Sequence, residues 1–269
     1  MRSGIWMKTM YARAWVRLMS YWGEPVWFAV NLGFPFLSST AMALLYKSTG
    51  LDSFVGFAIL GGIMVSFWGN VLWSMASQFN WDKQLGLFQL YLVSPAPLSA
   101  ILMGMSVGGI VGTLPSAALV TFCGWLFFSP PISPSWAAVG LTFALTLSSL
   151  YSFGMVLSSV YLAYGREAES MNEALHDPVA MLSGVYFPTI GRFSPFPVGL
   201  QAAVSLIPLT VGMYALRMTL FFGQGVADIY PYLLALAAMA VVLLFAALRS
   251  LKLFEEKGRR RGTLLVRQA

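Results

Sequence analysis

The sequence predicts an all-α integral membrane protein with six transmembrane helices, an N-terminal amphipathic interface helix and a re-entrant outer helical hairpin before the last span. Of its 269 residues, 58% are hydrophobic and only 10% are charged, whereas soluble domains carry about 25% charged residues. The apolar residues form runs long enough to cross a bilayer core of roughly 30 Å. The net charge of +6 lies in short segments beside these runs, which indicates membrane orientation and not nucleic-acid binding. Residues 1–269 are therefore expected to form a single transmembrane domain.

Residues 2–22 are expected to form an amphipathic helix. At helical spacing Tyr11, Leu18 and Trp22 fall on one side, and Arg13 and Arg17 fall on the other. Aromatic residues opposite arginines are typical of a helix that lies in the membrane interface. A helix that binds a soluble partner is the alternative.

Six apolar runs are predicted to span the membrane. The first has 22 residues, which as a helix would measure about 33 Å. Pro115 interrupts the third and longest run. The predicted spans cover residues 25–46, 53–76, 98–128, 136–164, 172–190 and 229–248.

The region 172–222 holds too many prolines for one straight helix and is too apolar for a solvated loop. We expect it to form the fifth span and then a re-entrant hairpin over 191–222. Broken backbone at membrane depth is tolerated only where protein or a water-filled cavity shelters it, so this hairpin is expected to cap or line a cavity on the outer side. The prolines expected to shape it are Pro188, Pro195, Pro197 and Pro208.

Both ends of the chain are basic, which under the positive-inside rule places both termini in the cytoplasm and requires an even number of spans. With six spans, 13 of the 16 basic residues are cytoplasmic, and only Lys47, Arg192 and Arg217 lie outside. The expected location is therefore the plasma (inner) membrane, with a multi-pass topology.

Segment 77–97 is the one extended segment outside the membrane between two apolar runs. Four apolar side chains recur at i, i+4, i+7 and i+11 and would share one face of a helix, with three polar residues beside them. Such a helix could rest on lipid or bind a partner protein, and we favour the partner. The apolar residues are Trp81, Leu85, Phe88 and Leu92, and the polar ones are Asp82, Lys83 and Gln89.

Gly104, Gly108 and Gly112 form a doubled Gly-x-x-x-Gly pattern in the third span. Small residues on one face allow close helix packing in lipid, either within the subunit or between subunits.

An ionisable cluster lies in the second cytoplasmic loop and at the start of the fifth span, where a solvated loop and helix cap, a gate or partner contact, and a proton relay are the alternatives. Its members are Arg166, Glu167, Glu169, Glu173, His176 and Asp177.

The sequence argues against a nucleotide or metal site in this chain. No glycine directly precedes any lysine, so the Gly-Lys pair of a phosphate-binding loop is missing. A chain with one histidine cannot build a multi-histidine metal centre. No cofactor is expected in this chain.

Together these features resemble the six-span permease subunits of ABC-2 type exporters. The likeness covers nearly the whole chain and is carried by the N-terminal amphipathic helix, by QLGLFQLYLVSPAP before the third span, and by LSGVYFP followed by PFPVGLQAAVSLIPLTVGMYALR. The resemblance implies that 77–97 is a cytoplasmic coupling loop for a separate ABC ATPase, which would hold ATP and magnesium. It also implies a homo- or heterodimer of permeases in membrane lipid that exports a lipid-linked, glycan or drug-like substrate, with no enzyme activity of the permease itself.

Two other functions are alternatives. An intramembrane lipid-modifying enzyme would need converging catalytic groups within the spans, and the sequence offers few. An ion-coupled carrier is opposed by the lack of an internal repeat between the two halves.

Overall fold

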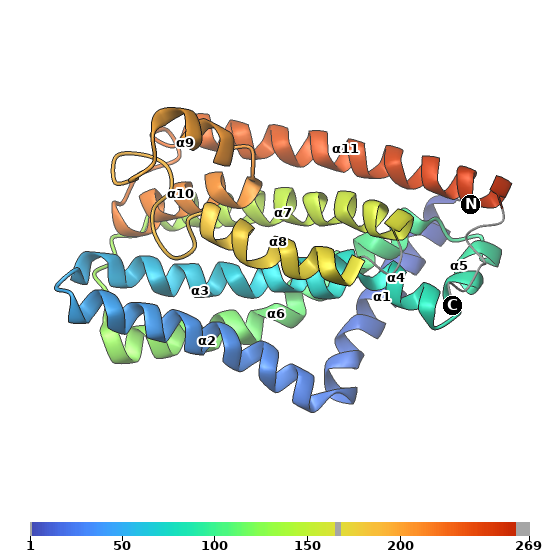
Figure 1. Cartoon of the computed structure of the whole chain (residues 1–269), viewed down its shortest axis with the longest axis horizontal. Helices are drawn as coiled ribbons and strands as arrows, with labels where there is room; N and C mark the ends of the chain where they lie inside the picture. Colours follow the sequence, from blue (N-terminus) through green and yellow to red (C-terminus); the bar gives the residue numbers. More distant parts are fainter. Residues whose placement is uncertain (1, 165–167, 262–269) are drawn as a thin grey trace.

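The computed structural model describes residues 2–164 and 168–261, and this part of the chain consists of helices and connecting turns without strands (Figure 1). Five of its helical segments are long and apolar enough to cross a membrane, and a sixth is obtained if one bent helix pair counts as a span. The predicted all-α membrane fold is thus confirmed. The long parallel elements are α2 (Pro25–Ser48), α3 (Val55–Gly69), α6 (Leu98–Phe128), α7 (Trp136–Tyr164) and α11 (Tyr230–Arg261).

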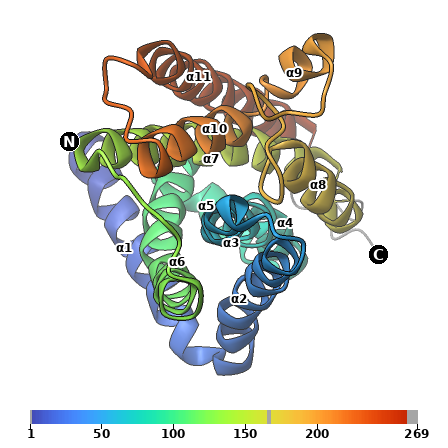
Figure 2. The same cartoon turned by 90° about the vertical axis from the view of Figure 1, so that its left-hand side faces the viewer.

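Helix α3 forms the centre of the bundle, because it is apolar on every side and neighbouring helices cover it. Figure 2 looks along the bundle and shows α3 between α2, α6, α7 and α8 (Ala168–Leu182). Phe67 and Trp68 are fully buried. The indole of Trp68 donates a hydrogen bond of 3.1 Å to the carbonyl oxygen of His176, which attaches α8 to α3.

Helix α1 (Arg2–Gly23) meets α2 at a corner and packs along α6. The glycines of the third span form the contact surface. A Cβ at Gly108 would lie 2.8 Å from the carbonyl oxygen of Ala14, one at Gly104 would clash with the backbone of Met10, and one at Gly112 with the ring of Tyr21. The glycine face is therefore occupied within the chain by α1.

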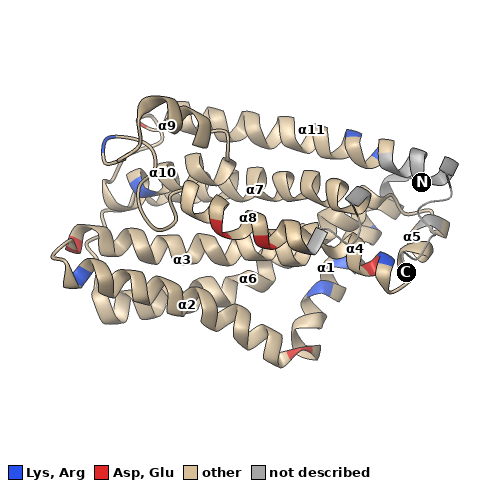
Figure 3. Ribbon diagram, viewed as in Figure 1, with Lys and Arg blue, Asp and Glu red and all other residues tan. Residues whose placement is uncertain are grey.

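The two ends of the bundle differ (Figure 1). One end holds both described termini, α1, α4 (Gln78–Gln84) and α5 (Phe88–Val93). The opposite end holds the turn at 49–54, the connection 129–135, α9 (Val198–Val204) and α10 (Pro208–Phe221). We call them the terminal end and the hairpin end. Figure 3 shows long stretches of the bundle without charge, with α8 as an exception.

The region before the last span differs from its predicted boundaries. The predicted span 172–190 is wrong at its end, because α8 stops at Leu182 and the chain has no helix from 183 to 197. Gly184 explains the stop, since its φ of +82° is the left-handed conformation in which many helices end. Helices α9 and α10 follow as a pair bent by 106°. This pair is the predicted hairpin near the C-terminus.

Candidate functional site

The segment between α3 and α6 contains two short helices after a π-helical continuation of α3, η2 (Asn70–Ala76). The predicted single helix from Trp81 to Leu92 is wrong. The chain turns between α4 and α5 at Gly86, whose φ is +76°, a conformation that a residue with a Cβ rarely adopts. The apolar stripe is consequently divided between two helices with different directions.

The exposed side chains of this segment, the coupling loop, differ from the predicted stripe. Leu85 is 69% exposed, and Gln89 is also exposed, whereas Lys83 is half-buried. The side chain of Leu92 lies outside the described residues. Three of the exposed positions were not predicted, because they would lie off the apolar face of a continuous helix, and only the turn at Gly86 signals them. The exposed apolar residues are Trp81, Leu85, Leu87, Leu90 and Val93.

Phe88 belongs to the core of the protein and is 1% exposed. Its ring packs edge-on against Phe79 of α4, with 5.6 Å between ring centroids, and against Tyr91 at 6.0 Å. Phe88 thus fastens α5 to α4, and its predicted place on a partner-facing stripe is wrong.

Asp82 is also buried, and it is the centre of a polar network that joins the coupling loop to α1. Arg13 of α1 donates to its carboxylate at 3.2 Å, Tyr91 donates at 2.9 Å, and Gln78 donates at 2.8 Å. Burial raises the pKa of Tyr91 to about 12, so its hydroxyl stays protonated and donates to the carboxylate. This arrangement fixes the coupling loop relative to the interface helix.

The four prolines predicted to shape the hairpin differ in their exposure to solvent. Pro188 and Pro208 are buried, and Pro208 opens α10. Pro195 and Pro197 are exposed, and Pro197 is the N-cap residue of α9. Fixed φ values suit proline at helix starts, which explains two of the four positions.

A buried arginine attaches the loop before α9 to α10. Arg217 of α10 is 3% exposed and donates a hydrogen bond to the carbonyl oxygen of Gly184. Its guanidinium also lies 4.7 Å from the ring centroid of Phe57. Among the described residues no carboxylate pairs with it. A hydroxyl of α2 holds the same loop, since Tyr46 donates to the carbonyl oxygen of Tyr186 at 2.6 Å.

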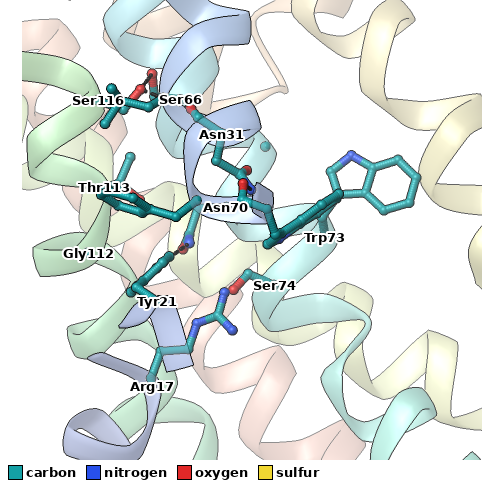
Figure 4. Close-up of a pocket in the computed structure, with 14 residues that line it drawn as sticks. Arg17, Tyr21, Asn31, Ser66, Asn70, Trp73, Ser74, Gly112, Thr113 and Ser116 are labelled. Atoms are coloured by element: carbon teal, nitrogen blue, oxygen red, sulfur yellow. Dashed lines mark hydrogen bonds between the residues drawn. The ribbon is translucent and has the colours of Figure 1, made fainter. Parts of the chain in front are cut away.

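A polar pocket lies where α1, α2, η2 and α6 meet (Figure 4). Its central residue is Asn70, whose amide nitrogen donates to Tyr21 at 3.1 Å and whose amide oxygen accepts from Tyr151 at 2.9 Å. Gly109 makes room for this amide, because a Cβ there would clash with it. Such π-helical segments often occur at functional sites.

The ionisable cluster is only partly described. Arg166 and Glu167, and the side chain of Glu169, lie outside the described residues. Glu173 and Asp177 are exposed on α8. A ring nitrogen of His176 lies 2.8 Å from the Asp177 carboxylate.

Asp177 lines a second cavity, of about 300 Å³, together with Trp27, Asn31 and Trp73. Within the described residues, no group of three or more His, Cys, Asp and Glu could hold a metal ion.

A bundle of long apolar helices with one bent helix pair is the architecture of a multi-span membrane protein. The family model described as "ABC-2 type transporter" matches residues 7–221. The chain belongs to this family and is a transport permease.

Curated relatives agree with the family match. The chain is 28% identical over 198 residues to the inner membrane transport permease YadH of Escherichia coli (strain K12), covering 72% of this chain and 76% of that protein. The same identity and coverage hold for the protein of that name in Shigella flexneri. A shorter match, 33% identical over 113 residues, is to a polyketide transferase of Gibberella fujikuroi. It covers 40% of this chain and 35% of that protein, too little to support a functional argument.

Proposed function

We propose that this permease is the membrane-spanning subunit of an ATP-driven exporter in the inner membrane, with both termini in the cytoplasm. Two permease subunits would act with separate ATPase subunits, which bind ATP and magnesium. The substrate class would be lipid-linked, glycan or drug-like molecules. Family membership and the basic terminal end support this assignment.

The observation that carries the proposal is the exposed apolar surface of the coupling loop. Leu85 and Leu90 are 69% and 66% exposed at the end of the bundle where both described termini lie. Exposed apolar side chains outside the predicted spans are candidates for contact with a partner. The ion pair between Arg13 and Asp82 supports the assignment, because a rigid loop transmits the motion of a docked partner to α1.

The cavity lined by Trp27, Trp73 and Asp177 is our candidate for the substrate path. It lies between α2, α3 and α8, and ionisable residues in membrane proteins tend to face such cavities. The bent pair of α9 and α10 would close it at the hairpin end.

The test is a pull-down of the ATPase with the variant Leu85→Asp. Burial of a leucine side chain contributes about 1.5–3 kcal/mol, and a carboxylate at the same contact adds a desolvation penalty. We expect association with the ATPase to fall at least tenfold, while insertion into the membrane stays unchanged.

The matched control is Leu51→Asp, because Leu51 is an exposed leucine at the hairpin end. It should leave association unchanged. Equal recovery of the ATPase with wild type and Leu85→Asp, at matched membrane expression, would contradict the proposal. The loop would then rest on lipid.

A further inference from the structure

An open apolar groove runs between α1, α2 and α6 on the side of the bundle where the interface helix meets the first span. Its volume is about 640 Å³, and its walls include Trp22, Phe28, Val111 and Pro115. Trp22 is 84% exposed. Tryptophan is enriched at the boundary between lipid tails and head groups, so an exposed tryptophan here suits a groove that meets lipid.

The groove adjoins the polar pocket of Figure 4. Tyr21, Phe28 and Gly112 line both, so the apolar groove leads directly to polar groups. The pocket is narrow, about 30 Å³, and therefore admits individual oxygen atoms and not a whole head group. Gly112 allows the ring of Tyr21 to pack closely at this junction, because a Cβ there would clash with the ring.

Arg17 provides a positive charge at this junction. Figure 4 shows its side chain reaching from α1 toward Ser74 of η2. Its Nε is buried and has no hydrogen-bond partner among the described residues, and its guanidinium lies 5.1 Å from the ring centroid of Tyr21. No described carboxylate pairs with it. The Arg17 side chain as a whole is half-buried. A buried polar atom without a partner is unfavourable, so an anionic oxygen beside this Nε would be stabilising.

Arg13, one helical turn earlier, has the opposite environment. It pairs with Asp82 at 3.2 Å. The two arginines share a helix, and one is neutralised by the protein while the other is not. The difference indicates that the charge of Arg17 is matched by a group from outside the chain.

We propose that the groove binds one anionic phospholipid of the bilayer, with its phosphate at Arg17 and an acyl chain between α1, α2 and α6. The shape supports a lipid, because the apolar groove adjoins the polar pocket that Arg17 lines. Tyr21 supplies a second contact, since its hydroxyl accepts from Asn70 and its own proton remains available to a phosphate oxygen. Lipid binding at this site would require neither the transported substrate nor the ATPase.

The experiment measures lipid binding to the purified full-length protein in nanodiscs of phosphatidylcholine with increasing fractions of phosphatidylglycerol. Native mass spectrometry after release would count bound lipids. We expect one tightly bound phosphatidylglycerol in wild type. Arg17→Gln should weaken it about tenfold, as expected for the loss of one charge-assisted hydrogen bond, and Arg17→Lys should restore most of the binding.

Arg192→Gln is the matched control, because it removes one exposed positive charge at the hairpin end. It should leave the bound lipid unchanged. Three results of the lipid measurement would overturn the proposal: equal binding by wild type and Arg17→Gln, equal loss in the Arg192→Gln control, or equal affinity for phosphatidylcholine. A dimer that dissociates in Arg17→Gln with no change in lipid would show that a second copy fills the groove, which also overturns it.

Discussion

The terminal end and the hairpin end of this permease each hold an irregular segment with one arginine, but they do so differently. At the terminal end Arg13 pairs with the carboxylate of Asp82, and the Arg13 side chain keeps 19% of its surface exposed. At the hairpin end the buried Arg217 donates to the carbonyl oxygen of Gly184, and no described carboxylate pairs with it.

The two ends are expected to differ in how much stability each loses when its arginine is removed. At the terminal end Arg13 is partly exposed, and the buried Asp82 keeps Tyr91 and Gln78 as donors when Arg13 is removed, so the loss of stability is expected to be small. A buried carbonyl that loses its donor has no such replacement. We infer that the hairpin end loses more stability without its arginine than the coupling loop does.

The largest effect on the stability of the protein is expected from Arg217→Met. The Gly184 carbonyl would lose its donor, at about 1–3 kcal/mol, and the ring of Phe57 would lose its cation. The melting temperature of the purified protein should fall, and proteolysis within 183–197 should increase. Arg192→Met, at an exposed arginine of the same end, should change neither. Unaltered melting of Arg217→Met would show that the two ends do not differ.

The helical membrane fold was predictable from the sequence because a long apolar run by itself predicts a transmembrane helix. Helix boundaries were less predictable where a single glycine decides them. Gly86 and Gly184 each take a left-handed conformation, and each ends a helix that the apolar pattern alone extends further. Polar Asp82 was predicted beside an exposed stripe, yet it is buried, because its partner Arg13 lies 69 positions away in the sequence.

The polar pocket was not predicted. Asn70, Tyr21 and Tyr151 come from three helices, and no local pattern links them. The three glycines of α6 were recognised as a packing face, but only the structure identifies α1 as the helix packed against them.

A second loss of stability is expected from Gly108→Leu. The side chain would collide with Ala14 and with the Cβ of Arg17, and overpacking typically destabilises by 1–3 kcal/mol. Gly140 has open space around it, so Gly140→Leu is the control. Thermal unfolding in detergent should show a lower melting temperature for the Gly108 variant alone. If both variants melt at the wild-type temperature, α1 is only loosely attached to α6.

A third effect concerns Asp82→Asn, which removes the ion pair at the terminal end. We expect a loss of about 1 kcal/mol, because Arg13 is partly exposed and water can replace much of the interaction. A double-mutant cycle with Arg13→Gln should give a coupling of roughly 0.5 kcal/mol or more. Additive effects of the two variants would show that the pair does not hold the loop.

The smallest effect on stability is expected from Pro197→Leu at the hairpin end. Pro197 is exposed and precedes a helix of 7 residues, and exposed substitutions usually change stability by less than about 0.5 kcal/mol. The variant should melt as wild type does, and it should bind the ATPase normally because the hairpin lies at the end opposite the coupling loop. Leu85→Asp should also melt normally yet lose the ATPase. The two variants together test whether the position of an exposed residue, and not its effect on stability, decides ATPase binding. Loss of ATPase binding in Pro197→Leu would show that the two ends are conformationally linked. The proposed division, with ATPase binding at the terminal end alone, would then be wrong.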